Sequence, residues 1–163
     1  MITARQLNHP GADNPLRRLA QQHLLAGLPG DDELLSLTRL AHWTDKSATP
    51  GLRVRSYLEV HCAVCHQPGG ASRGLFDARI TTPLESAGII NGELAAGDLG
   101  IAGAKVVVPG APEKSILFRR LSDTGFFRMP PVQYHNEPSP ILPIVEEWIR
   151  QMAVRADLNR QKP

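Results

Sequence analysis

Apolar residues recur three and four positions apart in several stretches of the chain, and this spacing places them on one face of a helix. The stretches begin near residues 14, 31, 51, 112 and 139. A short extended segment is predicted at 105–108, where valines follow one another. The pattern predicts an all-α protein, and its 14 glycines and 14 prolines predict long loops between the helices.

The start of the first helix is marked by two adjacent residues. Asn14 is a favourable N-cap, and Pro15 suits the first helical position. Because glycine and proline interrupt helices, we expect this helix to continue until Gly27 and the Pro29-Gly30 pair.

A second helix is expected to begin near Asp31 and to form a helical hairpin with the first. The residues from Thr44 to Pro50 have the composition of a linker. We therefore divide the chain into an N-terminal helical extension with its linker (1–50), a main domain (51–157) and a C-terminal tail (158–163).

The third helix is expected to run into the motif Cys62-Ala63-Val64-Cys65-His66 and to end at Pro68-Gly69-Gly70. The motif reads C-x-x-C-H, the attachment signature of a c-type haem. Two thiols at this spacing can each form a thioether with a vinyl group on one haem edge, and His66 can then bind the iron. The sequence therefore predicts one covalently bound haem c, held by Cys62, Cys65 and His66.

A Cys-x-x-Cys pair has three other common uses. A thioredoxin-like redox motif needs a βαβ setting, and no such pattern surrounds these cysteines. A structural zinc site needs four Cys or His ligands, and only scattered histidines remain to complete one. A disulfide across two intervening residues closes a very short loop and contributes little stability.

A glycine-rich stretch from Ala71 to about Ala111 follows the motif. It does not fit a phosphate-binding loop, and we expect it to wrap an edge of the haem, where small residues permit close backbone approach. A helix should then run from Pro112 to about Ser122. The last helix opens at Ser139-Pro140 and is expected to contain Pro143 in or before its first turn.

The second axial position of the iron is predicted to be filled by Met129. This methionine precedes two prolines, which stiffen the loop and reduce the freedom lost on binding. A His/Met pair also raises the reduction potential relative to two histidines. The histidines that compete for this position are His135, His42, His23, His9 and His61.

The overall charge argues against a nucleic-acid partner. The chain carries 18 Lys and Arg against 16 Asp and Glu, a formal net charge of +2, without a basic block. The hydrophobic fraction of 42% and the aromatic fraction of 5% leave apolar surface that a buried haem would supply.

Neither a membrane span nor a signal peptide is visible in the sequence. Covalent haem attachment takes place outside the bacterial inner membrane, so we expect a periplasmic or secreted protein. We also expect its signal peptide to have been removed or to lie upstream, with this chain a mature fragment or the C-terminal piece of a longer protein.

Several short sequence motifs resemble those of the class I cytochrome c family, and more narrowly those of the monohaem domains at the C-terminal end of larger secreted bacterial proteins. These motifs are Arg55-Ser56-Tyr57-Leu58, Cys62 to His66 with Pro68-Gly69-Gly70, Ser72 to Asp77, Gly97 to Ala104, Val108-Pro109-Gly110, Ser115-Ile116-Leu117, Arg119, and Arg128-Met129-Pro130-Pro131. The likeness covers roughly 51–155. It implies a cytochrome c-like fold with three main helices around one haem, the first carrying the motif and the last containing Trp148.

The resemblance also implies a basic or hydrogen-bonding residue beside the haem propionates, for which Arg73, Arg79 and Arg119 are candidates. One departure concerns the motif itself. Such domains often carry Asn before the first Cys and His before the second, where this chain has His61 and Val64. That difference leaves attachment intact and alters the rim of the haem.

The sequence thus predicts a monohaem c-type cytochrome, or the cytochrome domain of a larger redox protein, that transfers one electron at a time. It would not be an enzyme by itself, and its partner would be a redox protein or a fused redox domain. The alternative is a haem-based gas sensor or haem enzyme in which the distal iron position is open. A third possibility is a structural zinc or interaction module.

Overall fold

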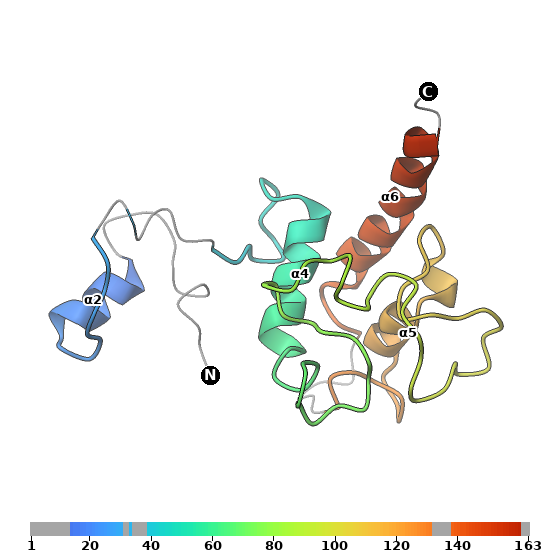
Figure 1. The fold of residues 1–163 in the computed structure, drawn as a ribbon, viewed down its shortest axis with the longest axis horizontal. Coiled ribbons are helices and arrows are strands. Elements are labelled where there is room, and N and C mark those ends of the chain that lie inside the picture. Colours follow the sequence, from blue (N-terminus) through green and yellow to red (C-terminus); the bar gives the residue numbers. More distant parts are fainter. Residues whose placement is uncertain (1–13, 31–32, 34–38, 132–137, 161–163) are drawn as a thin grey trace. The chain divides into compact units, whose positions relative to one another are not determined.

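The computed structural model describes residues 14–30, 33, 39–131 and 138–160, the side chains of 154–160 excepted. Contacts divide the chain into two compact units, Met1–Ala41 and His42–Pro163, and each is described by itself. The described residues form four α-helices and one short 3-10 helix, without a β-strand (Figure 1). The all-α prediction is therefore confirmed, while the predicted domain boundaries stay a prediction.

The first unit contains helix α2, Pro15–Gln21. Its start is as predicted, because the Asn14 side chain accepts a hydrogen bond from the Leu16 amide at 2.9 Å. Its end is earlier than predicted. His23 has a left-handed backbone with φ of 58°, and this conformation stops the helix well before Gly27. The second predicted helix lies mainly on residues outside those described.

The second unit begins its regular structure with helix α4, Pro50–His61. Thr49 caps it, since its hydroxyl accepts a hydrogen bond from the Leu52 amide. The helix ends directly before Cys62, whose carbonyl accepts a hydrogen bond from the His66 amide at 2.8 Å. The motif therefore forms a tight turn at the C-terminal end of α4, as the prediction of a helix leading into it requires.

Two further helices follow the long loop. The 3-10 helix η1, Pro112–Lys114, leads into α5, Ile116–Ser122. The last helix, α6, spans Leu142–Arg160 and contains Pro143 in its first turn, as predicted. Helix α6 packs against α4, α5 and η1. None of the described helices combines the length and the apolar character needed to cross a membrane.

The loop between the motif and η1 is irregular but firmly bonded. The extended segment predicted at 105–108 forms two isolated parallel bridges, one between Ile90 and Val107 and one between Lys105 and Ser115. The Val107 amide donates to the Ile89 carbonyl at 3.1 Å. These bonds tie one part of the loop to another and to the start of α5. They are isolated bridges and do not form a sheet among the described residues.

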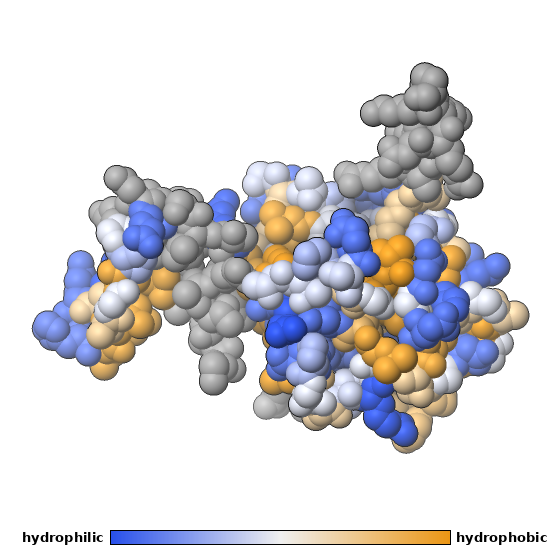
Figure 2. Space-filling model, viewed as in Figure 1, coloured by the Kyte–Doolittle hydropathy of each residue, from blue (hydrophilic) through white to orange (hydrophobic). Residues whose placement is uncertain are grey.

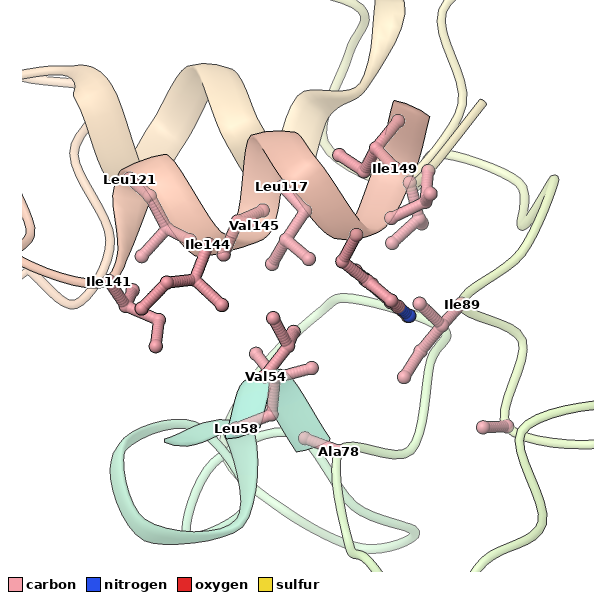
Figure 3. Close-up of a cluster of buried hydrophobic side chains, with 14 of the residues drawn as sticks. Val54, Leu58, Ala78, Ile89, Leu117, Leu121, Ile141, Ile144, Val145 and Ile149 are labelled. Carbon is pink, nitrogen blue, oxygen red and sulfur yellow. The ribbon is translucent and has the colours of Figure 1, made fainter. Parts of the chain in front are cut away.

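The core of this unit draws on both helices and loop. Val54 and Leu58 of α4 meet side chains from α5 and α6 (Figure 3). The loop adds Ala78 and Ile89, both fully buried. On the surface, polar and apolar residues are interspersed over the visible face (Figure 2). Because loop residues are part of the core, the loop is held in place by packing as well as by hydrogen bonds.

We expect Leu58→Ala to lower the free energy of unfolding by about 2–5 kcal/mol, because it removes a fully buried side chain and leaves a cavity. Denaturant unfolding measures this change. Leu52→Ala on the same helix is the matched control, since Leu52 is 39% exposed and should cost much less. Equal losses in the two variants would contradict the core described here.

Candidate functional site

The His42–Pro163 unit contains a cavity of about 500 Å³. Its wall includes Cys62, Cys65, His66 and Met129, which are the four site residues predicted from the sequence. They come from two separate segments, the turn after α4 and the loop after α5. The fold therefore brings the motif and the predicted second ligand to one partly open cavity.

The remaining wall is largely apolar and comes from five stretches of the chain. It contains Phe76, Leu94, Val106, Ile116, Leu117 and Leu121, among others. Its charged side chains are Arg73, Glu93 and Arg120. An apolar wall with a few charged groups is typical of a site that binds a large, mostly apolar ligand.

The two thiols are free, and no disulfide joins them. Burial, and secondly the neighbouring Cys65, raise the pKa of Cys62 to about 12, so this thiol stays protonated at neutral pH. Among the described residues, no group of three or more His, Cys, Asp or Glu side chains could hold a metal ion. The disulfide and zinc interpretations of the motif therefore gain no support.

The two residues between the cysteines face in opposite directions. Ala63 is 6% exposed and belongs to the hydrophobic core, whereas Val64 is 69% exposed. The turn is thus anchored by a small buried side chain in its middle. This anchor leaves both sulfur atoms at the cavity wall.

The His66 ring is enclosed by the segment that follows the motif. It stacks on the Phe76 ring, with centroids 4.2 Å apart and planes inclined by 19°. The Ser72 hydroxyl lies 3.1 Å from Nδ1 and 3.3 Å from Nε2. Burial, with a smaller contribution from the positive charge of Arg120, lowers the pKa of His66 and so favours the neutral imidazole. The neutral form is the one that binds metals.

Gly74 completes this enclosure. Its amide donates to the Ser72 hydroxyl at 2.9 Å. A Cβ atom built at Gly74 would lie 2.9 Å from Cε1 and Nδ1 of His66, which is closer than such atoms approach. Close backbone approach was predicted for the glycines of this loop, and at Gly74 the group approached is the imidazole.

Backbone hydrogen bonds fasten the turn to the loop. The His66 carbonyl accepts from the Ala78 amide at 2.8 Å, and the Cys65 carbonyl accepts from the Ser72 amide at 3.1 Å. The position of His66 therefore depends on the segment that contains Ala78.

An ion-pair network supports that segment. The Asp77 carboxylate accepts from the Arg79 guanidinium at 2.6 Å and from the Thr82 hydroxyl at 2.7 Å. From α4, the buried Arg55 donates to the carbonyls of Arg79 and Thr82. The hydrogen bonds from Arg79, together with the one from Thr82, hold the pKa of Asp77 well below its usual range.

The arginines suggested by the resemblance have different surroundings. Arg73 lines the cavity, Arg79 is paired with Asp77, and Arg119 is exposed on α5. The sequence interpretation missed Arg120, which does line the cavity. Helical spacing could have found it, because Arg120 follows Leu117 by one turn and shares its face.

Of the candidates for the second axial position that lie in the described residues, Met129 alone lines the cavity. The His61 ring contacts Tyr57, with centroids 4.2 Å apart, and His42 hydrogen-bonds to Thr44. His23 belongs to the other unit. The remaining two, His9 and His135, lie outside the described residues.

No protein-family model matches the chain, and comparison with curated proteins and with solved structures finds no match either. The ligand of the cavity must therefore be inferred from the residues that line it.

Gly74→Ala should destabilise the protein by roughly 1–3 kcal/mol, because the added methyl group must displace the His66 ring or the loop. Chemical denaturation gives the value. The control is Gly125→Ala, whose Cβ would find its nearest neighbour, an Asp123 carboxylate oxygen, at an ordinary 3.6 Å. If the two variants are equally stable, Gly74 does not confine the ring.

Asp77→Asn should reduce stability near neutral pH but not in acid. Because the pKa of Asp77 is lower in the folded state than in the unfolded state, its carboxylate stabilises the fold fully above about pH 4, and this contribution disappears as the pH falls further. The difference in unfolding free energy between the two proteins should therefore shrink from pH 5 to pH 2.5. Asp98→Asn, which alters an exposed carboxylate outside this network, is the control.

Proposed function

We propose that this protein is a monohaem c-type cytochrome that transfers one electron at a time. In this proposal Cys62 and Cys65 would bind the haem covalently, and His66 and Met129 would be the two protein ligands of its iron. The observation that supports the proposal is that these four side chains, from distant parts of the chain, line one cavity.

The rest of the cavity fits a haem. Its volume of about 500 Å³ lies in the range of sites for cofactors and other small ligands. Its apolar wall suits a porphyrin face, and Arg73 would supply a cation for a propionate group. When bound, the haem supplies an iron that alternates between Fe(III) and Fe(II).

Residues around His66 would prepare it as a ligand. Phe76 and Gly74 restrict the ring, and the Ser72 hydroxyl lies nearest to Nδ1. A hydrogen bond from Nδ1–H to Ser72 would select one tautomer and leave Nε2 for the metal. Such a partner also makes the imidazole a stronger donor.

Met129 would supply a thioether as the second protein ligand. Its backbone is held by a hydrogen bond to the end of α5, and Pro130 and Pro131 stiffen the chain after it. With two protein ligands, the iron would have no free position for a substrate. The surroundings would change little between the two oxidation states, and this favours electron transfer over catalysis.

The arrangement of helices supports a cytochrome c-like fold. Helix α4 leads into the motif, and α6, which contains Trp148, packs against α4. A built Cβ at Gly51 would lie 3.3 Å from Trp148 Nε1, so the two helices are close at this point. We propose a periplasmic or secreted location, where covalent haem attachment takes place, and a redox protein or fused redox domain as partner.

An absorption spectrum of the protein, produced in cells able to attach haem, tests the proposal. The oxidised protein should show the weak far-red band of His/Met ligation and should not react with carbon monoxide when reduced. Met129→Ala should lose the band and bind carbon monoxide, since an axial position is then open. Met152→Ala removes a methionine of α6 outside the cavity and should keep the band.

Two other outcomes would change the conclusion. Ready carbon monoxide binding by the unmodified protein, without the far-red band, would exclude Met129 ligation and favour a sensor or enzyme. If the measured intact mass of the protein does not include one covalently bound haem, the proposal as a whole is contradicted.

A further inference from the structure

Two hydrogen bonds join Arg120, in the last turn of α5, to the loop that carries Met129. The Met129 amide donates to the Arg120 carbonyl at 3.0 Å. The Arg120 guanidinium donates through Nη1 to the Phe127 carbonyl at 3.1 Å. One residue thus holds the loop at two points, and one of these bonds depends on its side chain.

The two phenylalanines at the tip of this loop contribute little apolar burial. Phe126 is 93% exposed and Phe127 is 50% exposed. Their rings contact each other edge to face, with centroids 5.3 Å apart. Because apolar burial contributes little here, the polar contact from Arg120 matters more for the position of the segment that leads to Met129.

The location of Arg120 is not explained by surface charge alone. Its neighbour Arg119 is exposed, whereas Arg120 is partly buried and lines the cavity. Arg120 therefore contributes to the cavity wall while its guanidinium bonds the loop carbonyl.

We propose that Arg120 is a positioning residue for Met129. Its side chain fixes the Phe127 carbonyl, and this fixes the backbone from which the thioether reaches into the cavity. The inference rests on the proposed function, because it takes Met129 as the axial ligand. Without the guanidinium contact, the loop moves away more easily and the bond between sulfur and iron is replaced more readily.

The test is a titration of the oxidised, haem-loaded protein with free imidazole, which competes with Met129 for Fe(III). Loss of the far-red band reports the replacement. Arg120→Leu should keep the band and bind imidazole about five- to tenfold more tightly, the effect of losing one hydrogen bond. Arg119→Leu removes the same charge one residue earlier, outside the cavity, and should stay within about twofold of the unmodified protein.

A second variant and a stability measurement separate positioning from general damage. Arg120→Lys keeps a cation and a donor and should restore at least half of the affinity difference on a logarithmic scale. The denaturation midpoint of Arg120→Leu should lie only slightly below that of Arg119→Leu, because Arg120→Leu removes a single hydrogen bond of the folded protein. A much lower midpoint for Arg120→Leu, or no rescue by lysine, would overturn the inference.

The two proposals fail in different ways. If the unmodified protein lacks the far-red band, Met129 is not a ligand, and the role of Arg120 is contradicted with it. If the band is present and Arg120→Leu binds imidazole no more tightly than Arg119→Leu, the inference is wrong while His/Met ligation stands.

Discussion

The packing of α4 against α6 is the interaction on which the rest of the His42–Pro163 unit depends. Val54 and Leu58 are fully buried in this contact region, and the motif begins only four residues after Leu58. Because the connection is short, the backbone at Cys62 can move little relative to Leu58. The buried face of α4 therefore determines where Cys62 lies. The cavity is therefore placed by hydrophobic burial, although its own wall consists mainly of loop residues.

Hydrogen bonds to these helices fix the positions of the loops. Backbone donors from Ala78 and Met129 meet the carbonyls of His66 and Arg120, and Arg55 of α4 supports the turn that contains Arg79. Irregular backbone needs such partners because it lacks the regular internal hydrogen bonds of a helix or a sheet. The two sides of the cavity are consequently built in the same way. On each side, a helix or the turn at its end provides hydrogen-bond partners for the backbone of an adjacent loop.

Much of this could be read from the sequence because the signals are local. Asn14 is a helix cap with a side-chain acceptor, and the motif itself spans five residues. The early end of α2 could not be predicted, since the left-handed backbone at His23 has no glycine to mark it. The core positions of Ala78 and Ile89 were also hidden, because an irregular loop has no period that separates inside from outside. Met129, in contrast, was found from its proline neighbours and its chemistry, and its ligation awaits the spectrum.

The opposite orientations of Ala63 and Val64 have an evolutionary consequence. A buried alanine within the core leaves no room for a larger side chain, whereas an exposed valine is free to vary. Two positions that a motif writes with the same letter x are thus expected to tolerate substitution to different degrees. Distant relatives of this protein should be sought with a small residue required after the first cysteine, any residue allowed before the second, and glycine required at the position of Gly74.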